Sequence, residues 1–147
     1  MRVRRGAIFA VAGVVLFLGY ASQISVRWNR AGLYAAETSA IKAIQTLNTA
    51  QVQYNSQLGR YARSLSELAA PAYNLIPADL ASGESRGYKF SMTEKPGGYT
   101  IQAMPTAFGH TGVRTFYSDQ SLRIRENYGA EPATAESREL GRPVFTK

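Results

Sequence analysis

Residues 32–58 read GLYAAETSAIKAIQTLNTAQVQYNSQL, and this stretch decides the fold expected for the whole chain. It contains no proline, its one glycine stands first, and helix-favouring Ala, Gln and Leu are frequent. Apolar residues recur every three or four positions and form one stripe on an otherwise polar helix. The stripe consists of Leu33, Ala36, Ala40, Ile44, Leu47, Ala50, Tyr54 and Leu58. Gly59 follows, where a glycine with positive φ commonly ends a helix.

The sequence before this stretch predicts a membrane span. No charge appears from Gly6 through Val26. Residues 7–26 form a helix long enough for a hydrocarbon core, at about 1.5 Å per residue. Arg2, Arg4 and Arg5 precede the span, so the positive-inside rule predicts that residues 1–6 are cytoplasmic. The predicted localisation is therefore a bacterial inner membrane, crossed once, with the C-terminal domain periplasmic or on the cell surface.

Residues 27–58 are predicted to continue the transmembrane helix as an amphipathic half, because nothing between the two forces a break. A secretory signal peptide cleaved after Ala21 is the alternative. In that case the mature protein would begin after the apolar segment and would have no anchor.

Residues 59–128 are predicted to form a small α+β domain. Ser64 and Glu67 have the spacing of a capping box for a short helix, which Pro71 ends, and residues 71–86 are expected to connect it to a sheet. Four short runs then alternate with period two and predict an antiparallel meander. The alternating positions are Tyr88, Phe90 and Met92, then Tyr99, Ile101 and Ala103, then Val113, Thr115 and Tyr117, and finally Leu122 and Ile124.

The resulting prediction is an α+β fold in which a long N-terminal helix packs on a small four-stranded antiparallel sheet. The last segment, 129–147, is rich in Pro, Ala, Thr, Glu and Arg and is expected to be a loose tail. Its closing Pro143-Val144-Phe145 is a candidate to dock on an edge.

Composition excludes several function classes. The 147 residues include no cysteine, which excludes disulfides, thiolate metal sites and a cysteine nucleophile. The net charge of +7 owes three charges to Arg2, Arg4 and Arg5, and the rest is spread thinly. No basic run interleaves with aromatic residues as a phosphate-tracking groove requires, so no nucleic-acid partner is expected.

The sequence also gives little indication of a catalytic or cofactor site. His110, the only histidine, lies in a glycine-rich loop, and the acidic residues form no pair on one predicted face. A calcium site built from Ser118, Asp119, Gln120 and Glu126 is a minor hypothesis beside ordinary turn chemistry. We therefore expect no enzyme, no cofactor, no metal site and no small-molecule substrate.

Several local segments resemble, in their order, those of type IV pilins and of the pseudopilins of type II secretion. Asn55–Tyr61 followed by Ser64–Leu68 is similar to the family's segment at the end of its long helix. Gly87–Phe90, Gly98–Pro105 and Gly112–Asp119 are similar to its sheet. The resemblance covers roughly residues 40–126 and implies a pilin-like fold.

The resemblance also implies a processing site, Gly6 followed by Ala7, where a prepilin peptidase cuts after the glycine. Pilins carry a glutamate five residues after the cut, and that glutamate is thought to pair with the neighbouring subunit's N-terminal amine. Here Val11 occupies that place. This departure argues against a major pilin.

The function implied is a pilin-like or pseudopilin-like subunit of a cell-surface filament or secretion assembly, in a minor or tip-like place. Its partners would be the inner membrane and other pilin-like subunits or an assembly platform. The alternative is a monomeric, membrane-tethered periplasmic binding domain that does not polymerise.

Overall fold

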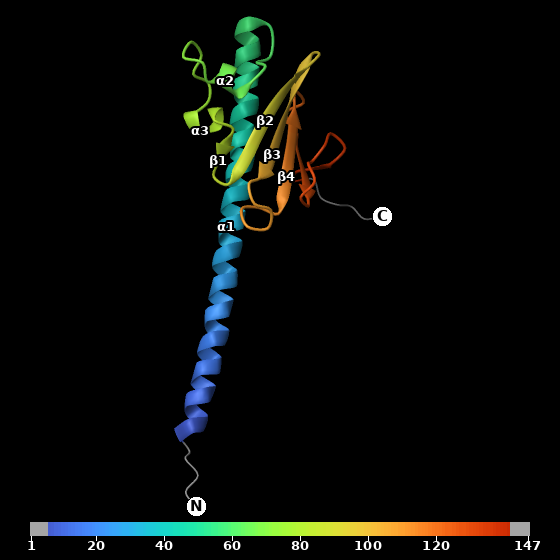
Figure 1. Cartoon of the computed structure of the whole chain (residues 1–147). Coiled ribbons are helices and arrows are strands. Elements are labelled where there is room, and N and C mark those ends of the chain that lie inside the picture. The colour runs from blue at the N-terminus through green and yellow to red at the C-terminus, as the bar shows by residue number, and fades with distance from the viewer. Residues whose placement is uncertain (1–5, 142–147) are drawn as a thin grey trace, which may run out of the picture. The chain divides into compact units, whose positions relative to one another are not determined.

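The computed structural model describes the backbone of residues 6–141 and the side chains of residues 30–141. The chain divides into two compact units, Met1–Gly32 and Leu33–Lys147. The first unit is helical from Gly6, and helix α1 (Gly6–Leu58) continues into the second unit (Figure 1). The predicted processing site, Gly6 and Ala7, and the apolar segment 7–26 have side chains outside the described residues.

The predicted membrane span is corrected by the structure. Crossing a hydrocarbon core takes about 20 mostly apolar residues in one helix. Among the residues that the structure describes, no helix combines that length with that apolarity. From Arg30 onward α1 carries Glu37, Lys42 and several Gln and Thr side chains, so this part of the helix is too polar to cross a hydrocarbon core. Within the described residues, this finding contradicts the prediction of a single-pass inner-membrane protein with a periplasmic or cell-surface domain, and the side chains of the segment 7–26 lie outside those residues.

Helix α1 ends at Leu58, and Gly59 follows with φ at 70°, as the sequence predicts. Ser64 is the N-cap of α2 (Leu65–Leu68), since its Oγ accepts a hydrogen bond from the amide of Glu67. The predicted capping box is only half formed, because the Glu67 carboxylate accepts from the amide of Arg63. The connection after Pro71 contains two short elements that composition did not indicate, α3 (Ala78–Ala81) and the first strand.

The sheet has six antiparallel strands, each paired with its neighbour in the sequence. The prediction of four strands is wrong, because two-residue strands flank the four predicted ones. Such short strands have no period-two pattern to reveal them. The strands are β1 (Glu84–Ser85), β2 (Tyr88–Lys95), β3 (Gly98–Pro105), β4 (Arg114–Asp119), β5 (Ile124–Tyr128) and β6 (Arg138–Glu139).

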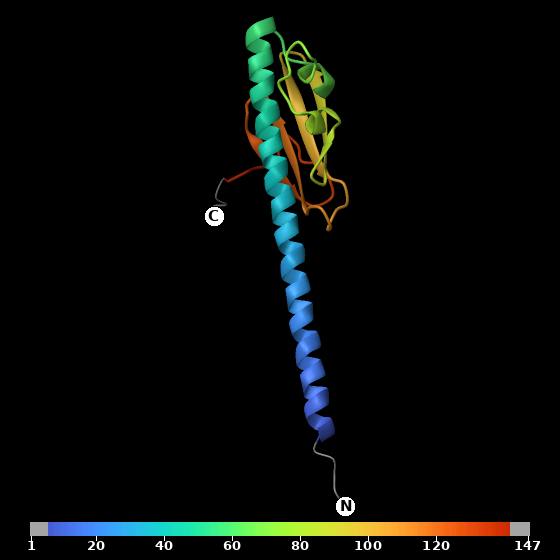
Figure 2. The ribbon, with the colours of Figure 1, turned by 90° about the vertical axis from the view of Figure 1, so that its left-hand side faces the viewer.

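The two faces of the sheet are covered by different segments. Residues of α1 from Leu33 onward, with α2 and α3, lie over one face, and the last part of the chain lies on the other side of the sheet (Figure 2). On the outer face, Gln102 Nε2 donates to the carbonyl of Ala133 and Thr115 Oγ1 to the carbonyl of Glu131. Residues 129–141, expected to belong to a loose tail, are thus held to the sheet by hydrogen bonds that composition cannot indicate.

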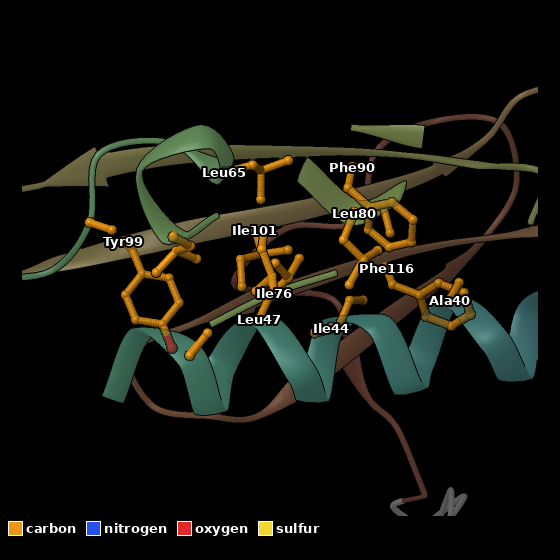
Figure 3. Close-up of a cluster of buried hydrophobic side chains, with 14 of the residues drawn as sticks. Ala40, Ile44, Leu47, Leu65, Ile76, Leu80, Phe90, Tyr99, Ile101 and Phe116 are labelled. Atoms are coloured by element: carbon orange, nitrogen blue, oxygen red, sulfur yellow. The ribbon is translucent and has the colours of Figure 1, made fainter. Parts of the chain in front are cut away.

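The hydrophobic core lies between α1 and the inner face of the sheet. Ile44, Leu47 and Ile101 are fully buried there, and Leu65, Ile76 and Leu80 close the core from the α2–α3 side (Figure 3). Burying an aliphatic side chain of this size contributes about 2 kcal/mol. The core therefore fixes which face of α1 points inward and which face stays outside.

Candidate assembly surface

One face of α1 is locked to the sheet by buried charges. The carboxylate of Glu37, whose side chain is 2% exposed, accepts hydrogen bonds from Nε and Nη2 of Arg114 at 2.9 and 2.7 Å. It also accepts one from the amide of Val113 at 2.9 Å. A buried carboxylate is tolerated only when it is paired in this way, so the contact determines where α1 meets the start of β4.

The same arginine continues the cluster into β5. Arg114 Nη1 donates to Glu126 Oε2 at 2.7 Å, and Arg138 Nη2 lies 2.7 Å from Glu126 Oε1 as an ion pair without hydrogen-bond alignment. Both guanidinium groups lie over the ring of Tyr128, at 5.5 and 5.9 Å from its centroid. Two carboxylates and two guanidinium groups thus balance one another, and we call these four residues (Glu37, Arg114, Glu126 and Arg138) the Arg114 cluster.

Two neutral contacts fix α1 to the domain about three turns further along the helix. Asn48 Nδ2 donates to Ser118 Oγ at 2.9 Å, and Tyr99 Oη donates to Asn48 Oδ1 at 2.9 Å. One turn later, the amide of Gln51 exchanges two hydrogen bonds with the backbone of Ala62, at 2.8 and 2.9 Å. A buried amide side chain whose donor and acceptor are both hydrogen-bonded fixes the position of the helix more precisely than apolar packing alone.

The end of α1 is fixed by a third charged group. Glu67 accepts hydrogen bonds from Arg60 Nη2, from the amide of Arg63 and from Tyr54 Oη, each at 2.6 Å. These donors, with Arg60 first, lower the pKa of Glu67 from its ordinary 4.5 to about 2. The carboxylate is therefore charged at any pH above about 3.

The opposite, outward face of α1 is almost uncharged. From Thr38 to Leu58, Lys42 is the only charged residue. Glu37 precedes this range and is buried. A solvated protein surface usually carries about one charged residue in three or four. The exposed positions of this face are Thr38, Lys42, Gln45, Thr46, Thr49, Val52, Gln53, Ser56 and Gln57. We call it the outward face of α1.

A shallow groove runs beside this face, where α1 passes the turn between β4 and β5. It encloses about 350 Å³ and is lined by Gln45, Asn48, Thr49, Val52 and Leu122. Val52 is 48% exposed and Leu122 is 51% exposed, so the groove presents two aliphatic side chains to its open side. None of the five lining residues carries a charge.

Leu122 is held in a conformation that leucine rarely adopts, with φ at 63°. Its amide donates to the carbonyl of Asp119 at 2.9 Å, and the amide of Ser121 donates to Asp119 Oδ1 at 2.8 Å, which closes the turn. A left-handed non-glycine residue costs about 1–2 kcal/mol, and Gly or Asn is the usual occupant. Strained backbone of this kind gathers at functional positions, so the half-exposed Leu122 marks the groove as a candidate contact surface.

The structure places the predicted packing stripe as follows. Ala40, Ile44, Leu47 and Tyr54 are buried in the core, whereas Leu33 is half-buried and Leu58 is 41% exposed. The stripe thus turns away from the core at both of its ends. Its central four residues form the side of α1 opposite the outward face.

The four residues of the calcium hypothesis have other partners. Glu126 faces the two guanidinium groups of the Arg114 cluster, and Ser118 is bound to Asn48. Asp119 closes the β4–β5 turn, and Gln120 is exposed at its tip. In the described part of the chain, no group of three or more acidic or histidine side chains could hold a metal ion.

Sequence analysis did not find the Arg114 cluster or the strain at Leu122. Arg114 and Glu37 lie 77 residues apart, and no local pattern relates them. A polar residue on the apolar side of a helix was the available signal, since Glu37 is adjacent to Ala36 of the stripe. In comparisons with known proteins, no family model, curated protein or solved structure matches this chain.

Proposed function

We propose that this chain is a pilin-like structural subunit that works by packing against other subunits of a filament or secretion assembly. The observation that carries the proposal is the outward face of α1, which is accessible, nearly uncharged and rich in Thr, Ser and Gln. Small hydroxyl and amide side chains allow close approach of a second protein surface and can hydrogen-bond across it. A helix destined only for solvent gains more from charged side chains.

The rigid attachment of α1 supports the same proposal. Three polar contacts, made by Glu37, Asn48 and Gln51, join the helix to the domain at three positions along its length. A surface held in one geometry binds a partner without a further ordering cost. The resemblance of segments 55–61, 64–68 and the sheet to pilins supplies the kind of partner, a related subunit. The absence of a glutamate at position 11 favours a minor or tip-like place.

The experiment compares two threonine variants of the full chain in its own cells. Thr49→Glu places a charge on the outward face, and Thr93→Glu places the same charge on the exposed edge of β2. Thr49→Glu is expected to remove the chain from high-mass assemblies, measured by mass spectrometry of fractionated material, whereas Thr93→Glu should not. Equal melting temperatures would show that both variants fold. Equal incorporation of the two variants would refute the proposal.

A monomeric binding domain is the second candidate, and the groove beside Leu122 favours it. Its two half-exposed aliphatic side chains suit an apolar peptide segment from a partner. This candidate predicts that the chain never enters an assembly and that Thr49→Glu weakens only the capture of a partner.

A further inference from the structure

The connection between β5 and β6 folds over the outer face of the sheet. Arg125 lies opposite Glu139 and Glu126 lies opposite Arg138, so residues 129–137 join two strands that are direct neighbours. A tight hairpin needs only about two to five residues for such a connection. The longer connection found here reaches back across β5, β4 and β3. We call residues 130–141, which include β6, the C-terminal arm.

The outer face holds this arm through side-chain donors that all bind main-chain carbonyl groups. Gln102 Nε2 of β3 donates to the carbonyl of Ala133 at 2.8 Å, and Thr115 Oγ1 of β4 donates to that of Glu131 at 2.7 Å. Two donors of β5 do the same at 3.0 Å, Arg125 Nη1 to Ser137 and Asn127 Nδ2 to Glu131. The sheet thus presents a ready-made set of donors for one segment of extended chain.

The arm is attached with little apolar burial. Of residues 130–141, Ala133 alone is fully buried, and Leu140 is half-buried against the core. A segment with few buried apolar contacts opens at a lower free energy than the core does. The arm can therefore detach while the rest of the domain stays folded.

Gly129, which lies between β5 and the arm, is a suitable hinge. Its φ is 155°, a backbone conformation that residues with a Cβ rarely adopt. The turn that folds the arm back onto its own sheet thus depends on glycine. When the arm extends away from the sheet, this residue is free to take an ordinary negative φ.

We propose that the outer face of β3, β4 and β5 is an exchange site, which takes the C-terminal arm of a second copy of this chain in place of its own. Detachment deprives Gln102 and the fully buried Thr115 of the carbonyls that they bind. The arm of a second copy offers the same carbonyls and the same Ala133 methyl group. Exchange of an identical element therefore conserves these contacts and changes only the hinge, which makes it a low-cost route to a dimer.

This exchange goes beyond the proposed packing of α1 and does not depend on it. The part of α1 from Leu33 onward and the arm lie on opposite sides of the sheet (Figure 1), so one copy can use both surfaces at once. Pro143-Val144-Phe145, a candidate to dock on an edge, follows the arm and lies outside the described residues.

Two single-cysteine versions of the full chain test the exchange, because the parent chain has no cysteine. One carries Arg125→Cys and the other carries Glu139→Cys, at positions directly opposite each other in β5 and β6. Side chains in such a pair lie close enough for a disulfide. The two chains are mixed at about 1 mM, where mass action favours dimers, and then oxidised. The disulfide-linked heterodimer is expected to exceed each homodimer at least about tenfold, whereas random collision gives about twofold.

The hinge provides a second measurement by light scattering after size-exclusion chromatography. Gly129→Ala strains the closed turn and should raise the dimer fraction at least about threefold. An added Cβ there would meet only Asn127 Nδ2 at 3.5 Å, an ordinary contact, so the variant tests conformation and not space. Gly141→Ala is the matched control, since Gly141 has φ at 78° in open surroundings but lies at the far end of the arm. A heterodimer yield at the random level, or equal dimer fractions for the two glycine variants, would overturn the proposal.

Discussion

Arg114 Nε and Nη2 both donate to one carboxylate oxygen of Glu37, at 2.9 and 2.7 Å, and so join α1 to a strand 77 residues away. The third nitrogen of the same guanidinium, Nη1, donates a hydrogen bond to Glu126 Oε2 at 2.7 Å. One side chain thus pairs with two carboxylates that are almost fully buried. The ion pair attaches the helix to the sheet, and removal of Arg114 would leave Glu37 without a cationic partner, whereas Glu126 would keep Arg138.

The first prediction concerns this arginine. Arg114→Met should lower the free energy of unfolding by about 3–5 kcal/mol, because it leaves Glu37 buried without a cationic partner and Glu126 with Arg138 alone. Arg123→Met is the control, since Arg123 is exposed and only 3.5 Å from Glu139. Its loss should cost less than about 1 kcal/mol. Urea denaturation of the two variants measures the difference, and similar midpoints would mean that the Arg114 cluster is not a stabilising unit.

The second prediction concerns pH. The folded pKa of Glu67, about 2, lies below its ordinary value of 4.5, so the folded state favours the carboxylate. The stabilisation is complete above pH 4.5 and is lost as the pH falls toward 2. Glu67→Gln should therefore make the melting temperature less dependent on pH between 2 and 4.5. It should also lower the free energy of unfolding at neutral pH by about 1 kcal/mol. An unchanged slope in this window would show that Glu67 is not responsible for it.

The third prediction tests the inward side of α1. Leu47 is fully buried, and Leu47→Asp should cost about 3–5 kcal/mol, enough to unfold a small domain. Thr46→Asp introduces the same group one residue earlier, at an exposed position, and should change the melting temperature little. Circular dichroism melts of both variants measure this contrast. If both variants melt together with the parent chain, the assignment of the packed face is incorrect.

The fourth prediction concerns the strain at Leu122. Asn tolerates the left-handed conformation, whereas a β-branched residue at φ of 63° is strained further. Leu122→Asn should therefore melt above Leu122→Val, with a difference of about 1 kcal/mol or more. Calorimetry of the two variants measures the order. The reverse order would show that packing of the side chain outweighs its backbone conformation.

Sequence patterns predicted the structural elements that depend on a few neighbouring residues or on a periodic pattern. The end of α1 at Gly59, the cap at Ser64 and the alternation from Tyr88 onward each follow from a few neighbouring residues. The two-residue strands β1 and β6 were missed because they exist only through pairing with β2 and β5. The contact of Glu37 with Arg114 was missed because charge complementarity over a long separation leaves no trace in composition. The groove beside Leu122 likewise arises only where α1 and the β4–β5 turn meet.

The simple order of the strands has a consequence for synthesis on the ribosome. Every strand pairs with the one made just before it, so the sheet closes through short-range contacts and can form quickly. Helix α1 is made first, yet Glu37 meets Arg114 only after 77 further residues have been added. At about 5–20 residues per second this takes about 4–15 s, during which Ile44 and Leu47 have no sheet to cover them. The nascent helix is therefore the segment that a chaperone would protect, and slow translation of residues 84–128 would prolong its exposure.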